Sequence, residues 1–458
     1  MDSRCPVLLL IFLLITALSN LAAGLRTAVN LTFTPPYLNE LKEGQTKSVV
    51  VLVSAAEEGF WLSSDQPCEL KIKSNSKTKA IVEQNDFQIL PTSNLSFNVT
   101  GVFLGKTQLS FELSQANLSL PLDINYRVWV LRGSRTLTAI FVSTLGCLII
   151  GANVLMGCEL NLDTVKDVLK KPVAPAIGFF CQFALMPLVA YSIARVLLVP
   201  AGLYSLGLGL FTAGCSPGGG ASNFWTLLLD GNVDLSVTMT FVSTVAALGM
   251  MPLWMYILGN RFVLDIEGAH LTIPYKDIVM YLVMLVAPIG IGVAIRHFRP
   301  VIAQTARKAL RPFIIFIIAF ILTFGVYANF YMFYLMTWRV LLSGLLLPWF
   351  GFMFGCFSAI LFRQSKQNVT AIAVETGIQN SGVAIMLLKI SFDQPDADLS
   401  SVIPVVVSIF TPIPLLIGYS IHYVLHCVNG VENDKEKDNL ESNRCLKCDT
   451  GKGDDSDV

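Results

Sequence analysis

The fold is decided by two stretches, GCSPGGGASN at residues 214–223 and ETGIQNSG at residues 375–382. Each lies within an apolar segment long enough to cross a bilayer, and each carries residues that interrupt a helix. Pro217 lacks a backbone donor, and the glycines at 218–220 permit backbone conformations that other residues avoid. In hydrocarbon an unpaired backbone group costs several kcal/mol, so a broken helix survives only where protein or a water-filled cavity surrounds it. The sequence therefore predicts two discontinuous helices that line a buried site.

The composition indicates a membrane protein. Of the 458 residues, 53% are hydrophobic and 14% are charged, and the mean hydropathy is +0.62. A soluble protein carries about 25% charged residues, so most of this chain is expected to face lipid or to pack against helices that do. The formal net charge of zero argues against a nucleic-acid partner. The sequence carries no Ser-His-Asp, P-loop or dinucleotide motif, so we expect neither an enzyme nor an organic cofactor.

Composition divides the chain into four expected parts, with bounds at 1–24, 25–132, 133–428 and 429–458. In the first part a basic residue, Arg4, precedes an apolar run, and small residues close the segment, which predicts a cleaved signal peptide. An uncleaved anchor is the alternative, but the apolar run is short for a membrane span. The last part is rich in Asp, Glu, Lys and Ser, so we expect a disordered cytoplasmic tail.

The second part predicts a small β-sandwich on the extracellular or lumenal side. Its β-branched and aromatic runs alternate with polar residues, and the expected strands include 49–53, 70–73, 95–99 and 109–113. Four N-x-S/T sequons follow the signal peptide and indicate glycosylation: Asn30, Asn94, Asn98 and Asn117. Cys68 is the single cysteine of this part, so the domain either rests on its own core or pairs through Cys68 with another chain.

The third part contains nine candidate spans of roughly 20 apolar residues each. They are 136–156, 172–198, 201–229, 233–258, 275–296, 312–335, 339–362, 367–391 and 402–427. An odd number places the two ends of the mature chain on opposite sides of the membrane. We expect a multi-pass protein of the plasma membrane with its N-terminus outside and its C-terminus in the cytoplasm.

The distribution of basic residues supports this orientation. The loops assigned to the inner side carry the excess of Lys and Arg, as the positive-inside rule requires. These residues are Lys166, Lys170, Lys171, Arg296, Arg299, Arg307, Lys308, Arg311, Arg363 and Lys366. The sequon at Asn368 falls on the inner side and is expected to stay unmodified.

The positions of the two interruptions suggest an internal repeat. The interrupted span is the third of the first four spans and the fourth of the last five. If the first set lacks a leading helix, the interruptions coincide in a repeat of five helices, which must be inverted relative to its partner. Paired interrupted helices of this kind indicate the ion and substrate site of a secondary transporter.

Glu375 is the one acidic residue near the middle of any expected span. A carboxylate at that depth is costly and usually pairs with an ion, a proton or a substrate path, although a structural hydrogen bond is the alternative. Gln379 and Asn380 follow at once, and such oxygen-rich side chains suit a small hard cation. At the other interruption, Ser222 and Asn223 offer oxygen ligands at the start of a half-helix.

A hydroxyl stripe follows this break, formed by Ser236, Thr240 and Ser243 at helical spacing. By itself such a stripe more often joins helices than binds a ligand. It gains weight because it comes directly after the first break.

These segments resemble the signature segments of the bile acid:sodium symporter family. The similarity spans about residues 136–427 and is carried by residues 182–188, 215–223, 234–240 and 375–380. The signal peptide and the β-rich domain resemble the N-terminally extended members. The resemblance implies a core domain with two crossed broken helices that moves against a panel domain by alternating access.

The resemblance also implies two sodium sites and a substrate cleft between the two domains. The first sodium site would use Ser222, Asn223, Ser236, Thr240 and Glu375. The second would use Gln182, Glu375, Gln379 and the backbone oxygens of Thr376 and Ile378. Candidates for the substrate cleft are Gly219, Gly220, Asn380 and Ser381, although many members carry Thr where this chain has Gly220. The expected partners are sodium, the lipid bilayer and an amphipathic organic anion such as a bile salt or a steroid sulfate.

Two other functions fit the same residues. A membrane receptor or scaffold could keep the transporter fold while its β-rich domain binds a partner, or Glu375 could carry a proton in place of sodium. The remaining motifs are weak. Two pairs, Cys445 with Cys448 and His422 with His426, lack the further ligands of a transition-metal site, and Cys427 could carry a lipid at the membrane edge.

Overall fold

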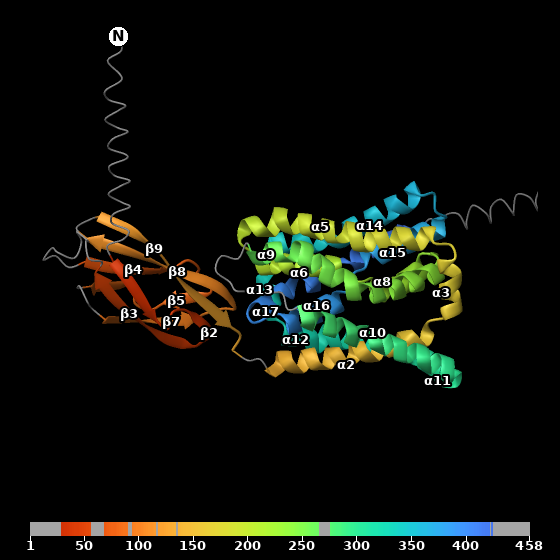
Figure 1. Cartoon of the computed structure of the whole chain (residues 1–458), viewed down its shortest axis with the longest axis horizontal. Helices are drawn as coiled ribbons and strands as arrows, with labels where there is room; N and C mark the ends of the chain where they lie inside the picture. Colours follow the sequence, from red (N-terminus) through yellow and green to blue (C-terminus); the bar gives the residue numbers. More distant parts are fainter. Residues whose placement is uncertain are drawn as a thin grey trace, which may run out of the picture. The chain divides into compact units, whose positions relative to one another are not determined.

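The computed structural model describes residues 29–55, 68–89, 94–115, 118–133, 136–264, 275–421 and 423–424. The expected signal peptide and tail, together with Asn117, His422, His426, Cys427, Cys445 and Cys448, lie outside the described residues. The chain divides into two compact units (Figure 1). Of the described residues, the first unit contains those up to Ala139 together with Asp393–Asp396, and the second contains the others.

The first unit is built from two β-sheets. One sheet has the strand order β1-β3-β7-β5 and the other has the order β2-β9-β8-β4-β6. The strands are β1 (Val29–Thr34), β2 (Leu38–Lys42), β3 (Thr46–Ala55), β4 (Cys68–Ser74), β5 (Ala80–Val82), β6 (Asp86–Ile89), β7 (Asn94–Gly101), β8 (Gly105–Gln115) and β9 (Leu118–Leu131). The four strands expected from the sequence lie within β3, β4, β7 and β8.

One apolar core is shared by the two sheets. In β3 the valines at 49, 51 and 53 are buried, while Val50 and Leu52 between them are exposed. The same core takes Phe97 from β7 and Phe111 from β8, whose ring centroids lie 6.4 Å apart. This alternation is the two-residue period of a strand with one face in a core, so the first unit is a β-sandwich.

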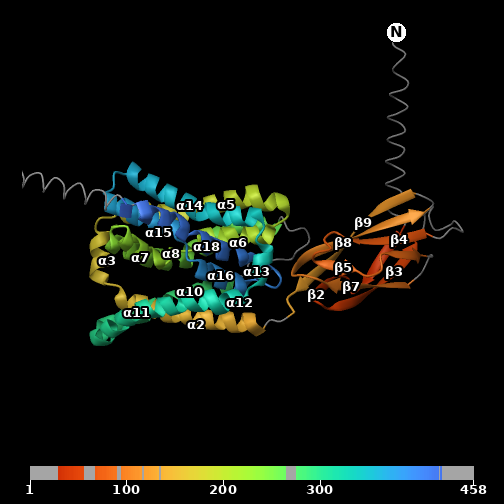
Figure 2. The same ribbon diagram turned by 180° about the vertical axis from the view of Figure 1, so that it is seen from behind.

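The second unit is helical, and most of its long helices pack side by side with similar axis directions (Figure 2). Among the described residues, six segments are long and apolar enough to cross a membrane. They are Thr136–Glu159, Val173–Ala201, Val233–Phe262, Tyr275–Phe298, Trp338–Leu361 and Asp396–Ile421. By element these are α2, α10 and α14, the run from α4 (Val173–Phe180) to η3 (Val199–Ala201), the run from α8 (Val233–Trp254) into α9 (Asn260–Leu264), and the run from α17 (Asp396–Ser400) through α18 (Val402–Phe410).

Two further apolar helices, α6 (Tyr204–Cys215) and α16 (Ser381–Ser391), are shorter than a membrane span. Each of them is one half of an interrupted segment. The first segment contains α6 and α7 (Ala221–Leu228), and the second contains α15 (Lys366–Gly377) and α16. Both interruptions predicted from the sequence are therefore present. Between α10 and α14, helix α11 (Pro300–Phe320) begins twelve residues before the expected span at 312 and continues through η5 (Ile321–Gly325) into α12 (Val326–Ala328).

Candidate functional site

The two helix breaks lie against each other and satisfy each other's backbone. Gly218 and Gln379 form an antiparallel β-bridge. The amide of Gly219 donates to the carbonyl of Ile378 at 2.8 Å, and the amide of Asn380 donates to the carbonyl of Pro217 at 2.9 Å. These bonds replace the helical bonds that the breaks remove, which is what a broken helix needs inside a membrane.

The Glu375 carboxylate lies at this crossing and is surrounded by hydroxyl groups. Its side chain, at the end of α15, is 3% exposed. Ser222 Oγ lies 2.5 Å from Oε2, and Thr240 Oγ1 lies 2.8 Å from Oε1 and 3.0 Å from Oε2. Ser236 Oγ lies 3.3 Å from Oε2 and 2.9 Å from Oδ1 of Asn223. The five residues expected at the first sodium site are thus brought together from α7, α8 and α15.

This cluster has more acceptor oxygens than protons. Three hydroxyls, one carboxylate and one amide oxygen contribute six side-chain oxygens, and a hydroxyl supplies a single proton. A single hydroxyl, Thr240 Oγ1, lies within 3.4 Å of four acceptors: both Glu375 oxygens, Asn223 Oδ1 and the backbone carbonyl of Ser236. A hard cation such as sodium would be held by these residues, because hard cations prefer oxygen ligands and one carboxylate offsets one positive charge.

The close approach of the carboxylate depends on Gly218. A Cβ built on this glycine would lie 2.1 Å from Glu375 Oε1, which is far inside contact distance. The backbone amide of Gly218 donates to Ser243 Oγ at 3.2 Å, so the third hydroxyl of the α8 stripe fixes the break. The glycine in the first break therefore makes room for the acid of the second.

A second group of amides lies beside the cluster. Gln182, which is 2% exposed, donates through Nε2 to Gln379 Oε1 at 2.8 Å and to the carbonyl of Ser216 at 2.7 Å. Gln379 in turn donates through Nε2 to the carbonyl of Thr376 at 2.8 Å. Gln182 Oε1 has no hydrogen-bond partner although it is buried. An unpaired buried oxygen is costly, and an oxygen-seeking ligand would satisfy it.

The position of Gln182 depends on a local distortion of its helix. Gln182 lies in a π-helical turn, η1 (Cys181–Leu185), between α4 (Val173–Phe180) and α5 (Met186–Ile193). Pro187 has no amide to donate to the carbonyl of Phe183, and Trp254 Nε1 donates to that carbonyl instead, at 2.7 Å. Such π-bulges are frequent at functional sites because they redirect one side chain out of the helical repeat.

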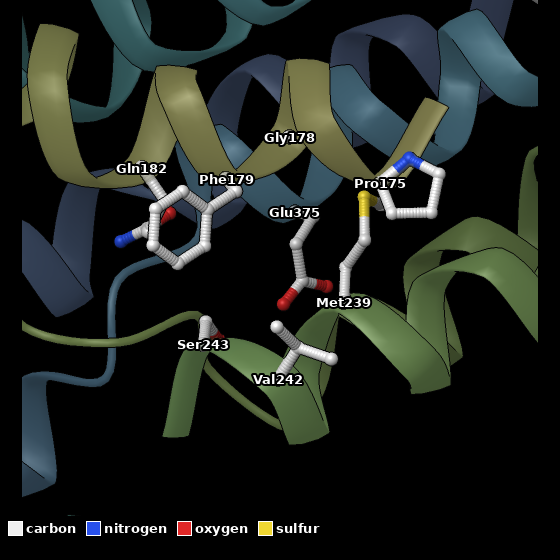
Figure 3. Close-up of a pocket in the computed structure, with 8 residues that line it drawn as sticks. All are labelled: Pro175, Gly178, Phe179, Gln182, Met239, Val242, Ser243 and Glu375. Carbon is white, nitrogen blue, oxygen red and sulfur yellow. The ribbon is translucent and has the colours of Figure 1, made fainter. Parts of the chain in front are cut away.

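A small cavity joins the two groups. Its volume is about 10 Å³, which is room for about one water-sized sphere. In Figure 3 the Glu375 carboxylate projects between the helix that carries Gln182 and the helix that carries Val242 and Ser243. The complete lining is Pro175, Gly178, Phe179, Gln182, Met239, Val242, Ser243 and Glu375.

The candidates for the substrate cleft differ in their surroundings. Gly219 is buried in the bridge, and Asn380 Oδ1 accepts from the amide of Val383 as the cap of α16. Ser381 is 8% exposed, and its amide donates to the carbonyl of Gln379. Gly220 is exposed, and a Cβ built there would meet nothing within 4 Å. Asn380 is partly exposed, and Gly220 is the one fully exposed residue of the four.

Two residues of the site were not predicted. Thr226 Oγ1 lies 3.2 Å from Ser236 Oγ, and Ser216 offers its carbonyl to Gln182. Thr226 follows Ser222 by one helical turn, so the four-residue spacing was a usable signal. The role of the Ser216 carbonyl depends on the tertiary fold and has no sequence signal.

Asn368 lies in the first turn of α15, where its Oδ1 accepts from Asn232 Nδ2 at 2.9 Å. Among the described residues, no group of three or more His, Cys, Asp or Glu side chains could hold a transition metal.

A helical unit with six membrane-length apolar segments places the chain among multi-pass membrane proteins. Two helix breaks that meet around a buried carboxylate are a feature of membrane transporters. The family model of the sodium bile acid symporter family matches residues 147–338. The chain belongs to this family, which is a family of transporters and not of enzymes.

Individual relatives match longer stretches of the chain, of 240 to 304 residues. The ileal sodium/bile acid cotransporter of Cricetulus griseus is 32% identical over 304 residues, which cover 65% of this chain and 84% of that protein. The P3 protein of Mus musculus is 32% identical over 59% of this chain and 56% of its own length. The sodium-dependent organic anion transporter of Bos taurus is 33% identical over 52% of this chain and 61% of its own length. Among solved structures, WR4, a C. elegans MSP family member, matches 23% of this chain and 99% of that chain at 11% identity, with a TM-score of 0.18 that supports no argument.

Proposed function

We propose that this protein is a sodium-coupled symporter of amphipathic organic anions, of the bile-salt or steroid-sulfate class. The observation that carries the proposal is the buried Glu375 carboxylate among hydroxyl and amide oxygens at the crossing of the two breaks. Relatives of this chain are named as an ileal sodium/bile acid cotransporter and a sodium-dependent organic anion transporter. The first sodium ion would bind the Glu375 cluster, and the second would bind near Gln182 and Gln379.

The proposed membrane arrangement has nine spans in an inverted repeat. The six long segments supply six spans, the two interrupted segments supply two more, and the run from α11 to α12 supplies the ninth. The N-terminal β-sandwich then lies outside the plasma membrane and the C-terminal tail lies inside. A core that contains the two breaks would move against a panel domain and expose the substrate cleft to each side in turn.

Sodium coupling provides sufficient energy for accumulation. At about −60 mV the entry of one net positive charge contributes roughly 1.4 kcal/mol. A roughly tenfold sodium gradient adds about 1.4 kcal/mol for each ion. Two sodium ions that carry one monoanion therefore supply about 4 kcal/mol, enough for about a thousandfold accumulation of the anion.

The proposal is tested by the change Glu375→Gln. We expect sodium-dependent uptake of a labelled bile salt or steroid sulfate to be abolished, because the site loses the negative charge that offsets the cation. The amide is nearly isosteric with the carboxylate and keeps an oxygen beside Ser222 and Thr240, so surface expression should persist. Uptake is measured in cells with sodium and with sodium replaced by choline, and it is normalised to surface protein.

The matched control is Glu159→Gln, which makes the same chemical change at an exposed acid at the end of α2 and should leave uptake intact. Undiminished sodium-dependent uptake by Glu375→Gln would refute the assignment. Uptake that follows pH in the absence of sodium would identify Glu375 as a proton carrier instead. A wild-type protein that transports no organic anion in either medium would favour the receptor or scaffold function.

A further inference from the structure

The outer face of one sheet of the β-sandwich has an unusual composition. On β1, β3 and β7 the outward-facing positions, which alternate with buried ones, hold Asn, Ser, Thr, Val and Leu only. Val50 is 43% exposed and Leu52 is 47% exposed, and Ile81 of the neighbouring β5 is 44% exposed. A charged side chain reaches this face from its edge: Glu83, just beyond β5, accepts a hydrogen bond from Asn98 Nδ2 at its carboxylate. A protein surface in water normally carries about 25–35% charged residues, so something other than charge must keep this face soluble.

Three of the four sequons lie on this same face. Asn30 of β1 pairs with Ser54 of β3, while on β7 Asn94 pairs with Leu52 and Asn98 pairs with Ser48. Residues paired across neighbouring strands point to the same side of the sheet, and so do alternate residues along one strand. Asn30, Asn94 and Asn98 therefore point to the side that exposes Val50 and Leu52, opposite the buried valines.

The three asparagines flank Val50 and Leu52, and Asn98 is two residues from Thr100, the partner of Ile81. Asn94 and Asn98 are four residues apart on one strand, or about 13 Å, and β1 lies two strand spacings, or about 10 Å, from β7. Val50 pairs with Ser96, so it lies between Asn94 and Asn98 along the sheet. Branched oligosaccharides attached at these positions would extend over the residues between them.

The other sheet is made soluble by charge. Lys73 of β4 and Glu112 of β8 form an ion pair with a distance of 2.5 Å on its outer surface, beside Lys71. The Lys73 ammonium and the Ser119 hydroxyl hold the pKa of the Glu112 carboxyl below its usual range. The described strands of this sheet carry no sequon asparagine: Leu118 and Ser119 of β9 belong to the fourth sequon, and its Asn117 lies outside the described residues. The two faces of the sandwich thus differ in the chemistry that makes them compatible with water.

We infer that the outer face of the β1-β3-β7-β5 sheet is a carbohydrate-bearing face, on which N-glycans at Asn30, Asn94 and Asn98 cover the exposed Val50, Leu52 and Ile81. The donor is an oligosaccharide linked to a polyprenyl diphosphate on the lumenal side of the secretory membrane. The asparagine Nδ2 forms a bond to the anomeric carbon of the sugar as the bond from that carbon to the diphosphate oxygen breaks. The diphosphate leaves with the electron pair, and the amide loses one proton to a base. The inference rests on the outside placement of the β-sandwich in the proposed function.

Occupancy is tested with the full-length chain produced in mammalian cells and treated with a glycan-removing amidase. Each change of Asn30, Asn94 or Asn98 to Gln should remove one step of gel mobility, and the triple variant should lose three. Thr32→Ala, Ser96→Ala and Thr100→Ala keep the asparagines but remove the sequon hydroxyls, so they should lose the same steps. The control Asn125→Gln changes an asparagine of β9 that is outside any sequon and should leave the mobility unchanged. A wild-type chain whose mobility the amidase does not change would overturn the inference.

The covering role is tested by the behaviour of the triple variant in detergent solution. Loss of the glycans should reduce the monodisperse fraction in size-exclusion chromatography, and Leu52→Lys added to the triple variant should restore it by supplying charge. A triple variant that stays as monodisperse as the wild type would overturn the covering role. Sodium-dependent uptake per surface molecule is scored separately, so failure of the carbohydrate face and failure of the proposed transport are distinguishable.

Discussion

At the scale of single residues, Gly218 sets how closely the two breaks approach. A Cβ at this position would lie 2.1 Å from Glu375 Oε1 and 2.9 Å from its carboxyl carbon. Gly218→Ala must therefore displace either the carboxylate or the β-bridge. We expect the sodium concentration for half-maximal uptake to rise about tenfold or more, which corresponds to about 1.4 kcal/mol or more of lost binding free energy. The measurement is a sodium titration of uptake.

The control for this change is Gly249→Ala on α8. A Cβ at Gly249 would meet nothing within 4 Å, and alanine favours a helix more than glycine does. Gly249→Ala should leave the sodium titration unchanged and should not lower the yield of folded protein. An unchanged sodium requirement in Gly218→Ala would show that the carboxylate does not need this space.

The residue types at the site could be predicted from the sequence because membrane interiors are poor in charge. A single mid-span acid next to Gln379 and Asn380 stands out, and so do the hydroxyls after the first break. The contacts could not be predicted in the same way. The hydrogen bond between Gln182 and Gln379 joins residues 197 positions apart, and the need for Gly218 follows from a clash with a residue of the other break.

At the scale of elements, α16 is held at the end farthest from its break by a buried ion pair. Lys389, in the last turn of α16, pairs with Asp398 of α17 (Asp396–Ser400), and the two side chains are 2% and 5% exposed. Tyr331 of α13 (Tyr331–Leu335) lies 3.1 Å from Lys389 Nζ and 3.3 Å from Asp398 Oδ1. A half-helix cannot rely on continuous backbone bonds through its break, so this contact helps to fix its position.

Lys389→Met should lower the stability of the protein by about 3–5 kcal/mol, because removal of one partner leaves a buried charge without its counter-ion. The double change Lys389→Met with Asp398→Leu should recover most of this loss, since no buried charge remains. The measurement is the free energy of unfolding in detergent.

The exposed pair of Lys170 and Asp167 provides the control, and Lys170→Met should have no measurable effect on that free energy. Equal stability of the single and double variants would contradict this account.

Element boundaries show where sequence reasoning stops. Pro217 and the neighbouring glycines mark the first break directly, because their backbone chemistry is local. The π-turn at Gln182 is different, since the carbonyl that Pro187 leaves unpaired is satisfied by Trp254, more than sixty residues away. Helix α11 starts at Pro300, whereas the span expected from the sequence starts at 312. The expected start is late because a search for apolar spans omits the basic, amphipathic first half of this helix.

At the scale of the whole molecule, the number of spans decides whether the two ends of the mature chain lie on the same side of the membrane. In the part of the chain that the structure describes, six segments satisfy the length and hydropathy of a span by themselves, whereas each interrupted segment is divided into two shorter helices. Nine spans place the ends of the mature chain on opposite sides, whereas an even number places them together. Lys166 of α3 (Leu162–Leu169), Lys170 and Lys171 just after it, and Arg299 between α10 and α11 lie on the expected inner side, where Lys and Arg are favoured.

This orientation predicts the labelling of two epitope tags in intact cells. A tag inserted after residue 28 should bind antibody without permeabilisation, and a tag after Val458 should bind only once the membrane is permeabilised. A cytoplasmic loop tag between Arg363 and Lys366 serves as the internal control, because that segment also lies on the expected inner side. If both terminal tags were labelled in intact cells, the number of spans would be even, and one interrupted segment would enter and leave the membrane on the same side. The two breaks would then no longer belong to an inverted pair, and the sodium site would need a different symmetry.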